Sequence, residues 1–150
     1  GFGLPAAMGV AIGMPGRSVV CVSGDGSIMM NIQELATLRR YGVPVKIILL
    51  DNSALGMVRQ WQELFFAERY SEIDPSDNPD LAALERVFGI AARGIARRDE
   101  VESGLREMLA HDGPFLLHVR IDPKANVWPL VPPNTPNHQM MDRAPAAATP

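Results

Sequence analysis

The sequence predicts an α/β fold, a parallel sheet with helices on both of its faces. Its 150 residues match the size of one ordinary domain, and its composition, 47% hydrophobic and 21% charged, is that of a globular protein rather than a disordered one. Short β-branched runs alternate along the chain with segments of helical periodicity. Strands separated by helices need crossover connections, which indicate parallel pairing and a sheet covered on both sides.

The first elements are a helix, a strand and a second helix. Leu4 to Ile12 is apolar and Ala-rich and is followed by Gly-Met-Pro-Gly, which predicts a helix and its stop. Residues 18–22 form a short β-branched run typical of a buried strand. Residues 27–41 carry apolar side chains at helical spacing, and Gly42 follows as a C-cap.

The middle of the chain adds a strand and two helices. Residues 45–50 indicate a second buried strand, and 54–66 a helix with an unusually apolar, aromatic surface. A polar loop at 71–77 follows. Asn78 is expected to be the N-cap of a helix over 79–89 that has a proline at its first position.

The last elements complete the sheet. Residues 91–95 predict a weaker strand and 115–121 a stronger one. Between them a helix is expected to end near Ala110, with a capping-box pattern formed by Asp99 and Glu102 at its start.

Proline divides the chain into two parts. Seven of the 13 prolines lie from Pro123 onward, which excludes a long helix or a central strand there. We therefore predict one domain over 1–122 and a Pro-rich C-terminal extension over 123–150, whose Ala/Pro-rich end is expected to be disordered. The chain begins on Gly1 inside a Gly-rich segment, which we interpret as the cut, N-terminally truncated end of a longer protein.

Charge and composition argue against several classes of function. The net charge of −3 is unlike a nucleic-acid-binding surface. One cysteine, Cys21, cannot form a disulfide framework, and as a mid-strand residue it is expected to be buried and inert. His111 and His118 have no ligand-spaced partner and are interpreted as structural. No bilayer-length apolar run and no signal-peptide pattern is present, so we expect a cytoplasmic protein that contacts no membrane.

Acidic and amide residues follow the first two predicted strands. The GDGS motif at 24–27 comes after the first strand, and the DN pair at 51–52 comes after the second. Open α/β sheets bind ligands at the carboxyl ends of their strands, so one crossover would bring Asp25 and Asn52 together. Carboxylate and amide oxygens suit Mg²⁺, while flexible glycines and a helix starting at Ser27 suit a phosphate. These parts predict a metal–diphosphate cradle.

Simpler interpretations of the same residues stay open from spacing alone. An Asp-Gly pair is more often a hairpin turn than a metal site, although the residues that follow it have helical periodicity. The pair Asp51-Asn52 alone fits a strand-end turn that caps a helix. Other phosphate motifs fail, because Met29 stands where a dinucleotide fingerprint needs glycine and no Walker sequence is present.

Longer stretches resemble a known family. The GDGS motif, the DN pair and the intervening QELAT at 33–37 are similar to the thiamine diphosphate signature. GFGLPAA at 1–7, LLDNSALGMVRQWQELFFAERYSE at 49–72 and NVWPLVPP at 126–133 resemble the large catalytic subunit of acetolactate synthase, also called acetohydroxyacid synthase. GMVRQWQ and the Pro-rich closing segment carry the more specific part of the match.

The resemblance implies the family's C-terminal thiamine diphosphate-binding domain, of the pyrophosphate type, over 1–122. Asp25 and Asn52 would be side-chain ligands of Mg²⁺, and Ala54 would add its backbone carbonyl. Met57 would lie beside the reactive part of the cofactor. The implied cofactor contacts in the GDGS motif are Gly24, Asp25, Gly26 and Ser27.

Trp61 would shape the pocket for the second 2-keto acid. Residues four apart on an apolar helix face, as Met57 and Trp61 are, more commonly pack in a core, and only the resemblance favours a functional role for them. Arg59 is either a solvated charge or a residue at the rim of the site. Phe65 and Phe66 are expected to pack or to contact a partner subunit.

The same resemblance implies an activity and its partners. The family condenses two pyruvates, or pyruvate with 2-ketobutyrate, with loss of CO₂, in the biosynthesis of the branched-chain amino acids valine and isoleucine. Thiamine diphosphate and Mg²⁺ are the expected cofactors, with FAD bound mainly by a domain outside this chain. A homodimer or homotetramer and a regulatory small subunit are the expected partners.

Two alternatives are kept. One is another thiamine diphosphate-dependent 2-keto acid enzyme, a decarboxylase, oxidase or carboligase. The other is an inactive truncated fragment, because the glutamate that activates the aminopyrimidine belongs in the family to an N-terminal domain. We expect the 150-residue chain alone to be inactive.

Overall fold

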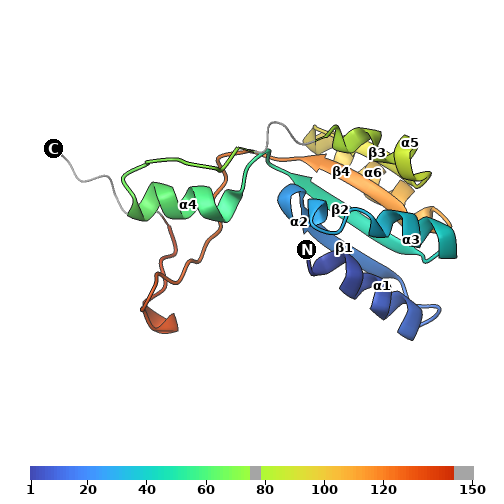
Figure 1. Ribbon diagram of the computed structural model, residues 1–150, viewed down its shortest axis with the longest axis horizontal. Helices are drawn as coiled ribbons and strands as arrows, with labels where there is room; N and C mark the ends of the chain where they lie inside the picture. The colour runs from blue at the N-terminus through green and yellow to red at the C-terminus, as the bar shows by residue number, and fades with distance from the viewer. Residues whose placement is uncertain (75–78, 144–150) are drawn as a thin grey trace.

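A parallel sheet forms the centre of the computed structural model, which describes residues 1–74 and 79–143 (Figure 1). Its spatial order is β1-β2-β4-β3, and every neighbouring pair is parallel. The predicted α/β class and the predicted strand positions are confirmed, the latter to within two residues. The strands are β1 Val19–Gly24, β2 Val45–Asp51, β3 Ala91–Ile95 and β4 Phe115–Arg120.

Helices connect the strands, as crossover connections between parallel strands require. Gly42, in the left-handed conformation at φ 61°, ends α3 as predicted, and its N–H donates to the Leu38 carbonyl. The helices are α1 Gly3–Gly13, α2 Asp25–Met29, α3 Glu34–Tyr41, α4 Gly56–Phe65, α5 Leu84–Phe88 and α6 Val101–Ala110. Short 3₁₀ turns lie at Leu81–Ala83, Arg98–Glu100 and Asn137–Gln139.

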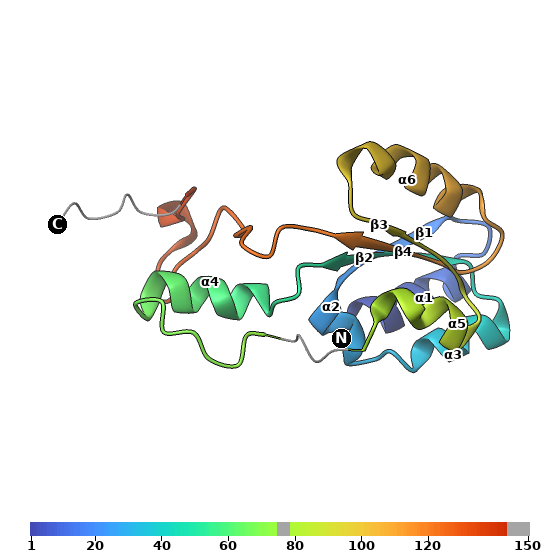
Figure 2. The same ribbon diagram turned by 90° about the horizontal axis from the view of Figure 1, so that it is seen from above.

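The sheet has a hydrophobic core on each face. On one face α1, α3 and α5 cover the sheet, with Leu4, Leu35 and Ile47 among the buried residues. On the other face α6 packs over β3 and β4 (Figure 2). Val20 and Val22 of β1, on this second face, are 45% and 61% exposed, so among the described residues the second layer covers only part of the sheet.

The helix predicted over 27–41 is wrong in its middle. α2 ends at Met29, and α3 begins at Glu34 after a run of turns. The side chain of Asn31 donates to the Gly1 carbonyl at 2.7 Å, and the backbone N–H of Asn31 bonds to Ile28 three residues back. Asparagine competes for such local bonds, which explains why apolar spacing alone overestimated the helix.

Two further expectations need correction. Asp99 and Glu102 do not form the capping box at the start of α6. The Glu100 carboxylate instead accepts the backbone N–H groups of Ala96 and Arg97, while Asp99 pairs with the Arg97 guanidinium. The helix expected over 79–89 is limited to the 3₁₀ turn and α5, and its predicted N-cap, Asn78, lies outside the described residues.

The helix α4 and the C-terminal extension lie together beyond the carboxyl edge of the sheet (Figures 1 and 2). An isolated antiparallel bridge joins Leu130 to Met141, and the described part of the extension holds no helix longer than one 3₁₀ turn. Residues 144–150, where disorder was expected, lie outside the description. None of the helices in the described ranges has the length and hydropathy needed to cross a bilayer.

Candidate active site

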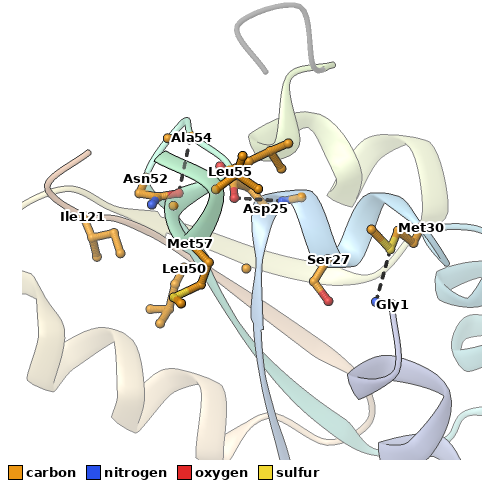
Figure 3. A pocket seen from close by; sticks show the side chains of 14 residues that line it. Gly1, Asp25, Ser27, Met30, Leu50, Asn52, Ala54, Leu55, Met57 and Ile121 are labelled. Atoms are coloured by element: carbon orange, nitrogen blue, oxygen red, sulfur yellow. Dashed lines mark hydrogen bonds between the residues drawn. The ribbon is translucent and has the colours of Figure 1, made fainter. Parts of the chain in front are cut away.

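The strand register brings the two predicted motifs together. Gly24, the last residue of β1, is paired with Leu50 of β2, so Asp25 and Asn52 both follow directly at the same edge of the sheet. A pocket of about 430 Å³, a size typical of small-ligand sites, opens there (Figure 3). The predicted site residues that line it are Gly24, Asp25, Gly26, Ser27, Asn52, Ala54 and Met57.

Asp25 is the one acidic side chain among the described residues that line this pocket. The residue is 4% exposed; its Oδ1 accepts the Gly26 N–H at 2.8 Å, and its Oδ2 has no hydrogen-bond partner (Figure 3). Burial raises the pKa of Asp25 above its ordinary value, and the neighbouring Asp51 carboxylate raises it further. Such a buried oxygen without a partner is costly unless a cation or donor completes it.

Asn52 and Ala54 stand on the turn that leaves β2. The Asn52 Oδ1 accepts the Ala54 backbone N–H at 3.3 Å, so the side chain and the turn are fixed to each other (Figure 3). A Cβ added to Gly56 would lie 2.8 Å from the Asn52 Nδ2, so any larger residue at position 56 would displace the Asn52 side chain. The turn thus brings Asn52 and Ala54 to the pocket that Asp25 lines.

Asp51 holds the same turn from behind. Its Oδ1 accepts both the backbone N–H and the hydroxyl of Ser53, at 2.9 and 3.1 Å, and its Oδ2 lies 2.7 Å from His118 Nε2. Burial opposes ionisation of Asp51, but the bonds from His118 and Ser53 outweigh it and hold the pKa of this carboxyl below its ordinary value. Asp51 therefore ionises more readily than Asp25.

Sequence reasoning missed the part played by His118. It stands 67 positions from Asp51 and has no ligand-like spacing, so no local pattern connects the two. The signal that could have found the pair is topological. Once β4 is placed beside β2, His118 lies level with Leu49, within reach of the carboxylate at the end of β2.

The donor set suits a hard cation that also binds phosphate oxygens. In the ranges that the structure describes, no three His, Cys, Asp or Glu side chains gather as a self-sufficient metal site. Asp25 would thus be the one charged protein ligand, joined by amide, carbonyl and ligand oxygens, which is how Mg²⁺ is often held. The helix dipole contributes less to phosphate binding than the sequence predicted, because α2 has only five residues and begins at Asp25 rather than at Ser27.

The rim of the pocket is apolar. Met57 and Val58 at the start of α4 are 46% and 44% exposed, and Leu55 before them is 39% exposed. Leu55 and Ile121 line the pocket without having been predicted. Trp61, one turn after Met57, is not among the described residues that line this pocket.

Trp61 instead makes an edge-to-face contact with Phe65. Their ring centroids are 5.6 Å apart at an interplanar angle of 74°. Phe65 and Phe66 are 39% and 50% exposed, which leaves the expected partner contact a prediction. Cys21 is buried as expected, and burial raises the pKa of its thiol.

Arg59 is neither a solvated charge nor a rim residue of this pocket. Its guanidinium pairs with Glu63 at 2.7 Å and donates to the Asn126 side chain and the Lys124 carbonyl of the extension. Arg59, Glu63 and Lys124 border a second cavity, which Ala54 also lines.

A family model for the thiamine pyrophosphate enzymes, C-terminal TPP-binding domain, matches residues 1–119. The chain belongs to the thiamine pyrophosphate enzymes. Within this family, it is similar to acetolactate synthase large subunits. It is 58% identical over 143 residues to the isozyme 2 large subunit of Escherichia coli K12, covering 95% of this chain and 26% of that protein. It is 47% identical over 142 residues to the large subunit of Parasynechococcus marenigrum, covering 94% of this chain and 23% of that one.

A further relative and a solved structure are also similar to this chain. A probable acetolactate synthase large subunit of Methanocaldococcus jannaschii is 43% identical over 133 residues, which are 89% of this chain and 22% of that protein. The solved structure is the thiamine diphosphate-dependent 4-hydroxybenzoylformate decarboxylase of Rhodococcus jostii RHA1, with TM-score 0.74 and 30% identity over 81% of this chain and 23% of that one. This thiamine pyrophosphate enzyme chain thus spans about a quarter of the length of the relatives it matches.

The site fits the cofactor that the family name specifies. Thiamine diphosphate carries an anionic diphosphate, and the pocket of this thiamine pyrophosphate enzyme presents one buried carboxylate with an unpartnered oxygen. An anion cannot bind directly beside that carboxylate, whereas a divalent cation between them would satisfy both.

Proposed function

We propose that this chain is the cofactor-binding C-terminal part of a cytoplasmic acetolactate synthase large subunit. The reaction would join two pyruvates, or pyruvate and 2-ketobutyrate, with loss of CO₂, in branched-chain amino acid biosynthesis. The observation that carries the proposal is the buried Asp25, whose unpartnered Oδ2 belongs to the same pocket as Asn52 and Ala54. The similarity of most of this chain to acetolactate synthase large subunits supports it.

The metal ligands would come from two strand ends. Asp25 would give a carboxylate oxygen, Asn52 its amide oxygen and Ala54 its backbone carbonyl to Mg²⁺. Asn52 would keep its orientation through the bond that its side chain accepts from Ala54. Ser27 would donate its hydroxyl to the diphosphate, at a point where the glycines of the GDGS motif let the backbone come close.

The apolar rim would serve the reacting end of the cofactor. Thiamine diphosphate supplies the carbanion chemistry when it is bound, and the protein positions it and excludes side reactions. Met57 would pack beside that reacting end, and Trp61, one turn along α4, would limit the space for the second 2-keto acid. Leu55 and Val58 would exclude water from the site.

Among the residues that the structure describes, those at the mouth of the pocket are left partly uncovered. Leu55, Met57 and Val58 are all partly exposed at its mouth. We expect the opposite wall, including the group that activates the aminopyrimidine and the FAD site, to come from other domains of a homodimer or homotetramer. A regulatory small subunit would be a further partner of the assembled enzyme.

A second candidate is a decarboxylase of the same cofactor class. The observation that favours it is the 30% identity to a structure named as a thiamine diphosphate-dependent decarboxylase. The lower identity, compared with 58% to a synthase subunit, makes it the weaker candidate.

A product assay separates the two candidates. The complete protein that carries this chain would be supplied with thiamine diphosphate, Mg²⁺, FAD, pyruvate and 2-ketobutyrate. We expect acetohydroxy acids as the main products; aldehydes alone would favour the decarboxylase. The 150-residue chain by itself is expected to give no acetolactate above background. Clear turnover by this chain would contradict the proposal that other domains complete the site.

A further inference from the structure

His118 is buried behind the proposed metal site rather than in it. It lies on β4, its side chain is 6% exposed, and its Nε2 is 2.7 Å from the Asp51 Oδ2. Because a carboxylate can only accept, the proton of this bond is on Nε2. The Asp51 side chain is itself 13% exposed, so the bond is largely shielded from water.

Asp51 connects His118 to the turn that carries the metal ligands. One carboxylate oxygen takes the bond from His118, and the other accepts two bonds from Ser53. Asn52 and Ala54 are the neighbours of Ser53 on either side, and they are bonded to each other. The carboxylate orientation therefore fixes the turn from which both ligands project.

The turn needs such a restraint because its backbone is unfavourable. Ser53 has φ 49°, in the left-handed region that a serine occupies at a cost of about 1–3 kcal/mol. The two bonds that Ser53 donates to Asp51 offset this cost only while the carboxylate keeps its present orientation. Without the His118 donor, the Oδ2 of Asp51 would be left buried close to the Asp25 carboxylate, and the side chain would turn toward water or another donor.

We propose that His118 is a positioning residue for the metal-binding turn: through Asp51 it holds the 51–54 segment in the conformation that presents Asn52 and Ala54 to Mg²⁺. The proposal rests on the proposed function, because it takes these residues to be ligands of a Mg²⁺–diphosphate complex. It assigns His118 no contact with the cofactor.

Three substitutions separate positioning from packing. His118→Leu fills similar space without a donor, and affinity for the Mg²⁺ complex of thiamine diphosphate should fall about 10- to 100-fold, as when a partner of a metal ligand is removed elsewhere. His118→Gln places an N–H near the position of Nε2 and should keep most of the affinity. His118→Asn carries the same amide on a shorter side chain and should lose affinity as the leucine variant does.

The measurement is calorimetric titration of the complete protein with the Mg²⁺ complex of thiamine diphosphate. Melting of the ligand-free protein reports whether each variant folds, and exposed His138→Leu is the matched control, expected to bind as wild type does. If His118→Leu fails to fold, the affinities of His118→Gln and His118→Asn are compared instead. In an Asp51→Asn background, His118→Leu should cost little more, because the two residues act as one unit.

The outcomes are distinguishable. Weak binding in the leucine and asparagine variants, with rescue by glutamine and non-additivity with Asp51→Asn, supports the proposal. Unchanged affinity in His118→Leu, equal loss in the glutamine and asparagine variants, or additive effects with Asp51→Asn would overturn it while leaving the proposed function intact. If wild type itself binds without Mg²⁺ dependence, the proposed function fails and this inference fails with it.

Discussion

Asp25 is the residue in which folding and function oppose each other. Its carboxylate is 4% exposed with one oxygen unpartnered, and burial raises its pKa. If stability were the only requirement, a buried position like that of Asp25 would hold an apolar side chain or a polar one with hydrogen-bond partners. An expensive buried acid beside a pocket is therefore a candidate functional residue, with a stated physical reason.

The cost should be measurable in the metal-free protein. Since the folded pKa of Asp25 lies above the unfolded value of about 3.9, its contribution to stability is complete below that value and is lost as pH rises through the folded pKa. Asp25→Asn should therefore raise the free energy of unfolding at pH 7, by about 1–3 kcal/mol, the usual cost of an unsatisfied buried group. Near pH 4 the gain should largely vanish. Urea unfolding in EDTA at both values tests this, and an equal gain at both would refute it.

We propose that Trp61 determines the preference for the second 2-keto acid. 2-Ketobutyrate exceeds pyruvate by one methylene, worth about 0.8 kcal/mol from buried area and up to about 1–3 kcal/mol, roughly 10- to 200-fold, in a shaped pocket. We expect Trp61→Leu in the complete enzyme to keep acetolactate formation but lose most of the preference for 2-ketobutyrate. A competition assay with both keto acids measures the product ratio.

Phe65→Leu is the matched control for Trp61. It removes the other ring of the same edge-to-face contact and should leave the product ratio unchanged. If Trp61→Leu keeps the wild-type ratio with activity intact, or if both variants shift it equally, then Trp61 is a packing residue.

At the scale of the elements, α4 is held by the C-terminal extension. Gln60 is 1% exposed, and its amide makes a two-way bond with the backbone of Val127, donating to its carbonyl and accepting from its N–H, both at 2.9 Å. Arg59, Glu63 and Asn126 add a polar network beside it. Because α4 carries Met57 and Trp61, the extension sets the position of the proposed substrate wall.

Gln60→Leu should release the extension locally. It leaves both backbone groups of Val127 without a protein partner, at a cost of about 1–3 kcal/mol each if they stay buried. We expect faster hydrogen exchange of the Val127 amide, with exchange in β2 unchanged. Gln62 makes the same kind of two-way bond with Ser71, so Gln62→Leu should speed exchange near Ser71 alone. Unchanged exchange at Val127 in Gln60→Leu would show that the bond restrains nothing.

The sequence predicted elements well where periodicity and local chemistry agree. β2 is an apolar run that only Lys46 interrupts before the terminal Asp51, and Gly42 ends α3 as a left-handed residue should. Prediction failed where a side chain forms a bond distant in sequence. Asn31 bonds to Gly1 and interrupts a helix, and Gln60 finds its partner 67 positions away. Such contacts exist only after folding, so no window of sequence contains them.

At the scale of the whole molecule, topology creates the site. Placing β1 beside β2 in parallel brings Asp25 and Asn52 to one edge, and adding β4 places His118 behind them. The first juxtaposition follows from strand order and was predictable; the second needed the order β1-β2-β4-β3. The apolar surface left at the pocket mouth could not be interpreted from spacing, because it depends on which parts of the assembly cover it.

Mg²⁺-dependent binding of thiamine diphosphate by the complete protein carrying Asp25→Ala tests directly whether this pocket holds the metal–diphosphate group. We expect Mg²⁺-dependent binding to be lost, because the one acidic side chain among the described residues lining the pocket would be gone and the neighbouring Asp51 is already bonded to Ser53 and His118. Asn52→Ala, which removes a neutral ligand, should weaken binding less, and exposed Asp99→Ala should leave it unchanged. Wild-type affinity in Asp25→Ala would contradict the assignment of this pocket as the metal–diphosphate site.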